Sequence, residues 1–483
     1  MVVTSSPGPS DADHVVVIGA GPAGLSAAVE LARRGTPVTV LETDAGSVAG
    51  AAGTVEFMGC RFDGASRLFS TELDDVWTLW SETLGEEMGP VGPPARIYYR
   101  GRTLSDPIDP SSAYLALGLA DGARCLAGYA QARLRPVTPV RSFADRLSNE
   151  VGRRWFSIFG KTYLEKVWGV PIAGLSADWA VWPISALQRA DGPAGSVGWY
   201  PRQGAGQLWQ AMATRLQATG NRVWMGQEVV AVRHARGRVI GITVRDSGGR
   251  SIDVLGSHFI STLPVGELIR RLWPAAPTVV RSAADALAYR AVITVNVVLD
   301  RAEVFPDRAL AIHDPAVRMA RVTNWKNFSP EMVADPGLTG LGIEYFCTDA
   351  DDLWAMSDAD LLDLGRRELM ALGLCGPEDV KTGIVCRLPK AYAVYDRPGE
   401  DPLAVIIEWL ERALPNLRLI ERSGIHDHDR VDDPTAEAML LARSLATRPA
   451  VRASRRAPDA QHAELGQEGG YTGASFRSGV AQR

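Results

Sequence analysis

A glycine-rich turn near the start of the chain constrains its fold more than any other feature. Gly19, Gly21 and Gly24 form the pattern G-x-G-x-x-G. The apolar run 14–19 before the turn predicts a buried parallel strand, and residues 22–34 after it have the apolar spacing of a helix. A strand that leads through such a turn into a helix is typical of the Rossmann type of dinucleotide-binding fold.

The three glycines and the next strand each have a physical task at a dinucleotide site. Gly19 permits the tight turn, Gly21 lets the backbone approach a pyrophosphate, and Gly24 lets the helix pack closely against the strand. The helix N-terminus favours the anion. The second expected strand, 36–42, ends in Glu42, whose carboxylate can accept hydrogen bonds from ribose hydroxyls and would repel a 2′-phosphate. The motif therefore predicts FAD or NAD and disfavours NADP.

The order of the later segments favours FAD over NAD. After Glu42 the chain enters a long insertion with helical patterns at 112–134 and 143–166. The strands that would complete the first sheet, 258–264 and 416–422, come much later. An NAD domain is usually one unbroken block, so a nucleotide domain assembled from distant pieces fits an FAD protein better.

We therefore predict an α/β protein with a discontinuous Rossmann-type FAD-binding domain and a mixed α+β substrate domain. The FAD-binding domain is expected to comprise 14–70, 200–285 and 400–446, and the substrate and helical domain 71–199 and 286–399. Residues 1–13 and 447–483 have few large apolar side chains, which predicts a disordered leader and a disordered tail.

The composition excludes several classes of protein. Of the 483 residues, 46% are hydrophobic and 22% charged, as in ordinary globular proteins. There are 51 Lys and Arg against 56 Asp and Glu, a net charge of −5, which argues against a nucleic-acid-binding protein. No apolar run approaches about 18 residues, so we expect no transmembrane segment, and residues 1–13 lack the pattern of a signal peptide. Five scattered cysteines without a CxxC pair predict a reducing, cytoplasmic location.

The sequence contains no motif for a metal or a nucleophilic site. There is no GxSxG, HExxH or Walker pattern. His426 and His428 are two residues apart and have no third ligand nearby, so we interpret this pair as part of a polar surface loop and predict no bound metal.

Seven longer blocks resemble one enzyme family. They are VVIGAGPAGLSAAVELARRG (16–35), GTVEFMGCRFD (53–63), KTYLEKVWGVPIAGLSADWA (161–180), YPRQGAGQLWQAMA (200–213), GIEYFCTDADDLWAMSD (342–358), LPKAYAVYD (388–396) and NLRLIERSG (416–424). In this order they resemble the FAD-dependent amine oxidase and protoporphyrinogen-oxidase-like superfamily, which neighbours UDP-galactopyranose mutase. The resemblance runs from about residue 14 to about residue 445, nearly the whole of the chain expected to be ordered, and implies a flavin ring held between an FAD domain and a substrate domain.

The chain departs from the family pattern where the resemblance places the flavin. The family usually has an arginine and two glycines shortly after the acidic residue, whereas this chain has Ala49 and Gly50 without the arginine. Ala65, Ser66 and Arg67 stand where the family tends to have a Gly-Gly-His cluster beside the flavin. Glu421 replaces a glycine before Arg422, and it adds bulk and negative charge near a pyrophosphate.

The motif and the resemblance together predict eight cofactor-binding residues. The resemblance implies that Val229 meets the adenine through its backbone and that the helix beginning at Asp432 approaches the flavin pyrimidine ring. The predicted set is Gly19, Gly21, Gly24, Glu42, Gly50, Val229, Arg422 and Asp432.

Five residues are the catalytic candidates, although in such enzymes the flavin supplies the chemistry and the protein orients it. Flavin amine oxidases often hold a water against flavin N5 with a lysine. Lys390, on an expected strand near Tyr392, is the candidate for this or for binding an anionic substrate, and the alternative is a solvent-exposed lysine. Arg67 would stabilise reduced flavin or bind a substrate phosphate or carboxylate, and the alternative is a surface ion pair. Arg202 would face the site from a loop, and Lys326 belongs to the substrate part of the resemblance.

Three functions remain open from the sequence. The first is an FAD-dependent oxidoreductase that moves a hydride from a C–N, C–O or C–C bond of a small molecule to flavin N5. The second is non-redox catalysis of the sugar-nucleotide-mutase kind, in which Arg67, Arg202, Lys326 and Lys390 would hold an anionic diphosphate substrate. The third is a homologue with a degenerate flavin site and a binding or redox-independent role. No feature of the sequence indicates an oligomeric state.

Overall fold

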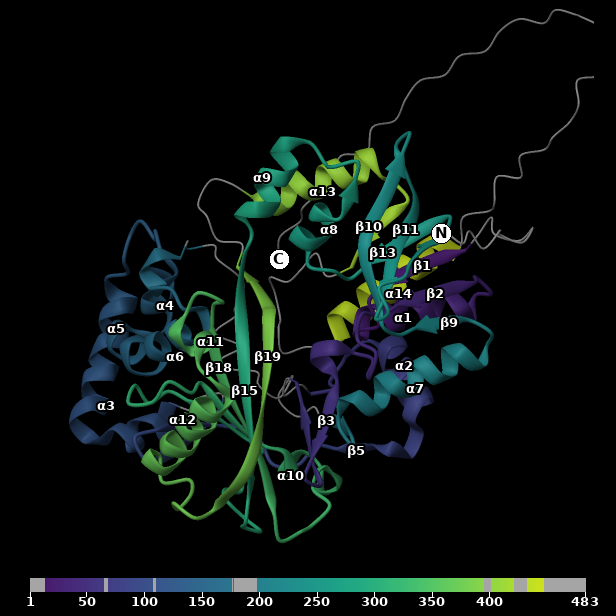
Figure 1. The fold of residues 1–483 in the computed structure, drawn as a ribbon. Helices are drawn as coiled ribbons and strands as arrows, with labels where there is room; N and C mark the ends of the chain where they lie inside the picture. Colours follow the sequence, from purple (N-terminus) through teal and green to yellow (C-terminus); the bar gives the residue numbers. More distant parts are fainter. Residues whose placement is uncertain are drawn as a thin grey trace, which may run out of the picture. The chain divides into compact units, whose positions relative to one another are not determined.

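The computed structural model describes residues 14–64, 68–106, 110–175, 177, 198–394, 401–420 and 432–446 (Figure 1). The described residues all belong to one compact unit. The leader and the tail expected at the two ends lie outside the described residues. No helix among the residues described is long and apolar enough to cross a membrane.

A five-stranded parallel sheet carries the glycine-rich turn. Its strands, in spatial order, are β20 (Leu417–Leu419), β13 (His258–Ser261), β1 (Val15–Ile18), β2 (Val38–Leu41) and β9 (Arg222–Trp224). Val15 pairs with both Val38 and His258, and Phe259 pairs with Leu417. The prediction that two late strands join the first sheet is therefore confirmed, and so is the Rossmann-type fold.

The parallel sheet is buried on both faces because β1 is apolar at every position. Val15 and Val17 face a core formed with helices, whereas Val16 and Ile18 face a second core shared with an antiparallel sheet. The helices on the first side are α1 (Pro22–Arg33), α2 (Asp74–Leu84), α7 (Ala205–Ala218) and α14 (Asp432–Ala446). The sheet and helices on the second side are β10 (Gln227–Ala235), β11 (Arg238–Asp246), β12 (Ser251–Val254), β14 (Leu272–Trp273), α8 (Val265–Arg270), α9 (Thr278–Ala286) and α13 (Pro402–Ala413).

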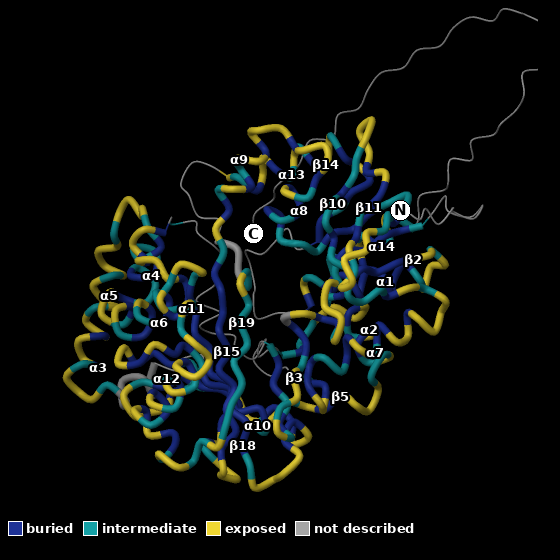
Figure 2. Tube along the Cα trace, in the orientation of Figure 1, coloured by how far each residue is buried: buried dark blue, intermediate teal, exposed yellow. Residues whose placement is uncertain are grey.

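A seven-stranded mixed sheet forms the second main layer. Its strands, in order, are β19 (Val380–Val394), β15 (Ala288–Leu299), β18 (Thr339–Cys347), β17 (Arg321–Asn324), β16 (Ala309–Ile312), β6 (Arg96–Tyr99) and β7 (Arg102–Ser105). Figure 2 shows β15 buried along most of its length, while β19 at the edge is partly exposed. One face packs against α12 (Asp358–Ala371), and two short helices, α10 (Trp325–Phe328) and α11 (Asp352–Ala355), lie nearby.

The helical insertion differs from the expectation at two places. Helix α3 (Pro110–Leu134) covers the predicted 112–134 but is interrupted at Gly118, where φ is +77° and ψ is 166°, and the pattern at 143–166 is not one helix. It forms α4 (Phe143–Val151), α5 (Arg153–Trp155), a π-helix η4 (Phe156–Gly160) and α6 (Lys161–Trp168). The break is at Gly152, whose φ is +86° and whose missing Cβ would lie 2.7 Å from the nitrogen of Tyr129 on α3. Glycine allows both this backbone conformation and this close approach.

Two small antiparallel strand pairs, one of them a hairpin, add to these layers. They are β3 (Thr54–Phe57) with β4 (Cys60–Asp63), and β5 (Met88–Pro90) with β8 (Trp199–Pro201). The β3–β4 hairpin reaches the seven-stranded sheet, because a Cβ on Gly340 of β18 would lie 3.1 Å from the ring of Phe62. Short 3-10 helices span Gly50–Ala52, Gly85–Glu87, Ile172–Gly174 and Pro330–Met332.

Candidate active site

The glycines of the turn have the three different environments that the motif predicts. Gly19 has a φ of +99°, and a Cβ there would lie 2.1 Å from Oγ1 of Thr262. A Cβ on Gly24 would lie 2.0 Å from the carbonyl oxygen of Gly19, so this glycine sets the approach of α1 to β1. A Cβ on Gly21 would meet nothing within 4 Å. Space is therefore open at Gly21, where the motif expects a ligand.

The N-terminus of α1 is suited to an anion at that open space. Gly21 is the N-cap, Pro22 takes a first-turn position, and no side chain caps the helix. The first turn has no acidic residue. Uncapped backbone N–H groups and the helix dipole favour a phosphate, so these residues fit the pyrophosphate of a dinucleotide.

Glu42 is held beside the turn by backbone groups. Its carboxylate accepts hydrogen bonds from the N–H of Ala20 at 2.8 Å and from the N–H of Asp44 at 2.9 Å. The N–H of Gln227 donates to the carbonyl of Glu42 at 2.7 Å, which places the start of β10 alongside. Val229 follows on β10 and is buried, and its carbonyl accepts a hydrogen bond from Nε of Arg271 at 2.8 Å. Glu42 and Val229 therefore lie on neighbouring segments.

Ala49 and Gly50 lie at the same turn. The N–H of Ala49 donates to the carbonyl of Ala20 at 2.9 Å. Both residues have a left-handed backbone, with φ of +79° at Ala49 and +48° at Gly50. Ala49 thus adopts a conformation that usually favours glycine.

The other predicted cofactor residues have two outcomes. Asp432 is fully buried at the start of α14, which packs against α1. Arg422 lies outside the described residues, as does the catalytic candidate Arg67. The structure therefore brings together Gly19, Gly21, Gly24, Glu42 and Gly50, with Val229 on β10, the strand that begins beside Glu42.

Among the catalytic candidates whose side chains the structure describes, Lys390, Arg202 and Lys326 have different partners in different parts of the fold. Lys390 is on β19 and forms an ion pair with Glu267 of α8, while its ammonium lies 5.9 Å from the ring centre of Tyr289. Burial lowers the pKa of Lys390. Tyr392 pairs with Arg290 in the sheet, and its side chain lies outside the described residues.

Arg202 and Lys326 hold loops elsewhere. Arg202 is half exposed, pairs with Glu331 at 3.2 Å and donates to the carbonyl of Glu86 at 3.1 Å. The ammonium of Lys326 donates to three backbone carbonyls, those of Ala302, Pro336 and Leu338. These contacts give both residues structural partners, and their predicted catalytic roles stay predictions.

The buried carboxylate of Asp63 was not singled out in the sequence. Asp63 ends β4 and accepts hydrogen bonds from Oγ1 of Thr54 at 2.6 Å, from the hydroxyl of Tyr200, and from the N–H of Ala205 at the start of α7. Burial raises the pKa of Asp63 to about 6, although these hydrogen bonds lower it. Asp63 thus ties the β3–β4 hairpin to α7, immediately before the segment that contains Arg67.

A polar row crosses one face of the seven-stranded sheet. Thr294 and Asn296 alternate with apolar residues on β15, and both are buried. Thr294 pairs with Cys386 on one side and with Glu344 on the other. Arg321 of β17 lies 3.7 Å from Glu344. We call Thr294, Asn296, Arg321, Thr323, Glu344 and Cys386 the polar row.

The polar row lies between two different parts of the molecule. Val298, one step along the same face of β15, joins the core that contains the β3–β4 hairpin and α1. Val292, at the other end of the row, joins the core of α4 and α6. The row therefore occupies the face of the sheet between the hairpin that precedes Arg67 and the helical insertion.

One point in this row contains unsatisfied polar atoms. Within the described part of the chain, Oδ1 of Asn296, Oγ1 of Thr323 and Nε1 of Trp325 are buried and have no hydrogen-bond partner. A Cβ on Gly342 would lie 2.7 Å from Nε1 of Trp325 and 3.1 Å from Oδ1 of Asn296. We call this group the Gly342 cradle. Buried polar atoms are nearly always paired with protein, water or ligand, so the cradle has capacity for one more polar group.

A weak signal for the cradle exists in the sequence. In the strand ITVNVV, at 293–298, Thr294 and Asn296 break an apolar run with a period of two. The partners Thr323 and Gly342 belong to other strands, and only the register shows that they adjoin Asn296 and each other.

No metal site accompanies these groups in the described segments, where no cluster of three His, Cys, Asp or Glu residues has the geometry to hold an ion. His426 and His428 lie outside the described residues.

The parallel sheet, the open helix N-terminus and Glu42 define a dinucleotide-binding α/β protein. The family model for flavin containing amine oxidoreductases matches residues 22–395. The chain therefore belongs to this family of flavoenzymes. The predicted resemblance is confirmed, and so is FAD as the cofactor. No curated protein sequence matches the chain.

Solved structures share the fold across nearly the whole chain. A reduced UDP-galactopyranose mutase has a TM-score of 0.74 at 20% identity, covering 90% of this chain and 96% of that one. A putative protoporphyrinogen oxidase from Exiguobacterium has a TM-score of 0.68 at 16% identity, covering 90% and 98%. Cyclohexylamine oxidase from Brevibacterium oxydans has a TM-score of 0.62 at 17% identity, with the same coverage. At these identities the likeness shows the fold alone.

Proposed function

We propose that this protein is an FAD-dependent oxidoreductase that oxidises a C–N, C–O or C–C bond of a small-molecule substrate. The observation that carries the proposal is the open space at Gly21, in front of the uncapped N-terminus of α1 and beside Glu42. Bound FAD would supply hydride acceptance, followed by reoxidation by dioxygen or another acceptor.

The chain's own residues would bind the cofactor at the carboxyl ends of β1 and β2. The N–H groups at the start of α1 would hold the pyrophosphate, since nothing else caps them. Glu42 would accept hydrogen bonds from the ribose hydroxyls, because its carboxylate is already oriented by Ala20 and Asp44. Asp63 would act as a positioning residue by fixing the hairpin that leads to Arg67.

The polar row supports a substrate position on the seven-stranded sheet. The Gly342 cradle offers an acceptor at Asn296, a donor at Trp325 and a hydroxyl at Thr323. A substrate hydroxyl or amine that enters it would find both kinds of hydrogen-bond partner. Apolar walls around a few convergent polar groups are typical of small-molecule sites.

The ion pair of Lys390 with Glu267 restricts its role in this proposal. To act in the reaction, the ammonium must leave this ion pair, or a water must bridge it to the reacting atoms. The proposed cytoplasmic location rests on the scattered cysteines of the sequence alone.

The absorbance spectrum of the purified protein is the first test. The proposal expects a band at about 450 nm and FAD in the supernatant after heat release. Substrate consumption should then occur with oxidised enzyme and oxygen. Turnover only after dithionite reduction would instead indicate a mutase-like, non-redox reaction. A colourless protein that takes up no added FAD would contradict both.

A further inference from the structure

A cavity lies beside the helical insertion, apart from the residues assigned to the flavin or the substrate. It has a volume of about 340 Å³, within the range of small-molecule sites. Its walls come from the turn between β6 and β7, from α3, from α5 to α6, and from the loop before β17. None of the residues that line it belongs to the glycine turn or to the polar row.

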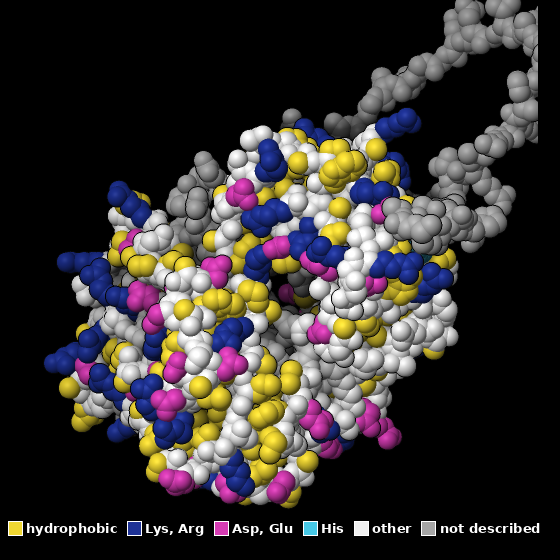
Figure 3. All heavy atoms as spheres, in the orientation of Figure 1, with side chains coloured by type: hydrophobic (Ala, Val, Ile, Leu, Met, Phe, Trp, Pro, Cys, Tyr) yellow, Lys and Arg dark blue, Asp and Glu magenta, His cyan; other side chains and the backbone are white. Residues whose placement is uncertain are grey.

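The lining of this cavity is basic. It contains three arginines, Arg100, Arg102 and Arg154, against a single carboxylate, Asp121. Figure 3 shows many Lys and Arg side chains over α3 to α5 on this side of the molecule, with fewer acidic ones among them. A pocket with excess positive charge attracts anions and raises their local concentration.

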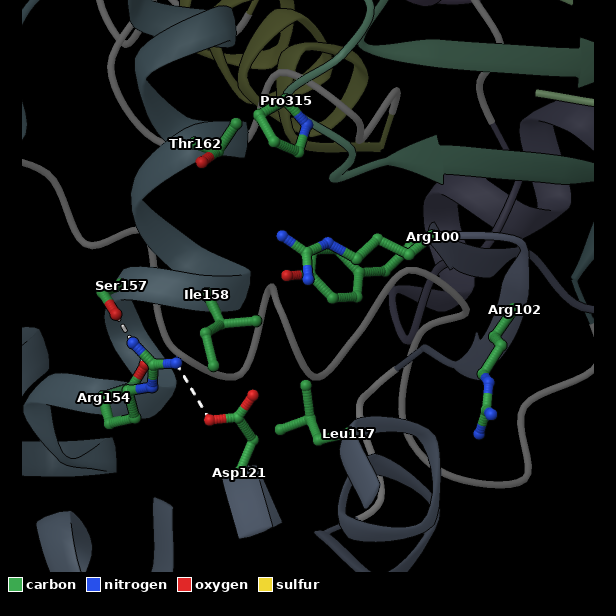
Figure 4. Close-up of a pocket in the computed structure, with 10 residues that line it drawn as sticks. Arg100, Arg102, Leu117, Asp121, Arg154, Ser157, Ile158, Thr162 and Pro315 are labelled. Atoms are coloured by element: carbon green, nitrogen blue, oxygen red, sulfur yellow. Dashed lines mark hydrogen bonds and ion pairs between the residues drawn. The ribbon is translucent and has the colours of Figure 1, made fainter. Parts of the chain in front are cut away.

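Arg100 is anchored through its backbone. It has a φ of +50° at the tip of the β6–β7 hairpin, and its backbone N–H donates to the carboxylate of Asp314 at 3.2 Å. Its guanidinium lies 5.3 Å from the ring centre of Tyr99. No ion pair of Arg100 exists within the described residues. Figure 4 shows its guanidinium at the centre of the cavity, between Thr162 and Ile158.

Arg154 supplies a second cation from the opposite wall. It donates to Asp121 at 3.0 Å, and Asp121 also pairs with Arg124 at 3.1 Å. The hydrogen bonds from these two arginines lower the pKa of Asp121. Figure 4 shows Arg154 and Asp121 at one end of the cavity, while Arg102 points away from them.

We propose that this cavity binds a small phosphate-bearing molecule. Arg100 and Arg154 would contact the phosphate, because guanidinium groups match its oxygens in a bidentate way. The hydroxyl of Thr162 adds a donor, and Ile158, Leu117 and Pro315 give the cavity an apolar side for the rest of the ligand. Asp121 sets a limit on affinity because it neutralises Arg154 in the absence of ligand.

Titration calorimetry with inorganic pyrophosphate tests the proposal. The protein is loaded with FAD, because pyrophosphate would otherwise bind at the empty dinucleotide turn. The ionic strength is held constant, because salt screens the attraction between the arginines and the anion. We expect a dissociation constant of about 1 mM or tighter. Arg100→Gln and Arg154→Gln should each weaken binding about tenfold, whereas Asp121→Asn should tighten it about threefold by removing a competing charge.

The control is Arg412→Gln on α13, an exposed arginine paired with Glu408 far along the chain. It should leave binding unchanged. The proposal would be overturned if the wild type showed no heat of binding. It would also be overturned if Arg412→Gln weakened pyrophosphate binding as much as the cavity variants do, or if Arg100→Gln bound pyrophosphate as tightly as the wild type. Citrate binding as tightly as pyrophosphate would overturn the assignment to a phosphate. The proposal does not rest on the oxidoreductase function, since the variants report on this cavity alone.

Discussion

Adding one methyl group at Gly24 or at Gly21 should have different consequences, although both residues belong to one turn. At Gly24 the new Cβ would lie 2.0 Å from the carbonyl oxygen of Gly19. Carbon and oxygen atoms need more than about 3 Å, so α1 or β1 must shift by about 1 Å or more. Overpacking of this kind costs up to about 3 kcal/mol, and the better helix propensity of alanine offsets about 1 kcal/mol. We expect Gly24→Ala to lower the free energy of unfolding by about 2 kcal/mol.

At Gly21 the same methyl group meets no protein atom within 4 Å. The backbone there has φ of −73° and ψ of 178°, which alanine adopts without strain. Alanine is a poor N-cap, so a loss of about 0.5–1 kcal/mol in stability is expected. FAD should bind at least about tenfold more weakly, because the methyl group occupies the space into which the pyrophosphate would come.

Urea denaturation of the flavin-free variants measures the first effect, and quenching of FAD fluorescence on titration measures the second. The two variants serve as controls for each other, since each should change mainly one readout. Wild-type FAD affinity in Gly21→Ala would refute the assignment of the open space to the cofactor. Wild-type stability in Gly24→Ala would refute the packing argument.

Three further predictions concern the sites beyond the turn. Because the pKa of Asp63 is raised to about 6, the folded state binds the proton of this carboxyl more tightly than the unfolded chain does. The free energy of unfolding should therefore fall by about 3 kcal/mol as pH rises from about 4 to 6. Asp63→Asn should reduce this pH dependence in urea titrations at several pH values. Gly342→Ala fills the cradle and should raise KM with FAD still bound, and an unchanged KM would exclude the cradle from substrate binding. Lys390→Met should lower kcat more than Glu267→Gln does if the lysine acts in the reaction, whereas equal effects would indicate an ion pair alone.

The nucleotide-binding part of the fold is predictable because its signals are local. The strand 14–19, the glycine turn and the helix 22–34 are adjacent in sequence, and the structure has β1 and α1 within them. The late strands 258–264 and 416–422 were predicted to join the first sheet, and both do, but their order in it comes from the structure alone. The division of the chain into an FAD-binding and a substrate domain stays a prediction.

The helix predicted at 143–166 shows where apolar spacing fails. Its apolar spacing continues past Gly152, but this glycine is the C-cap of α4 and has a φ of +86°. A glycine at this position is a local stop signal that apolar spacing alone does not register. The backbone of α3 also lies close to Gly152, which leaves no room for a Cβ there.

The candidate site was harder to predict. Basic residues in loops, such as Arg202 and Lys326, suggested chemistry, yet each has nearby partners that hold the backbone. The Gly342 cradle combines residues of β15, β17 and α10, so its unsatisfied atoms become visible only once the strand register is known. Buried polar atoms on a strand indicate a site when they have no hydrogen-bond partner. A sequence does not show which polar atoms have partners.

The backbone conformation of Ala49 bears on whether the flavin site still binds its cofactor. The lost glycine suggested that the cofactor site had drifted, but the backbone at Ala49 keeps the left-handed conformation that a glycine would adopt. An alanine held there costs about 1 kcal/mol or more, and the N–H of Ala49 still donates to Ala20 within the glycine turn. A chain that had lost the need for this geometry would be free to relax it. The retained strain therefore favours an altered but working cofactor site over a degenerate one.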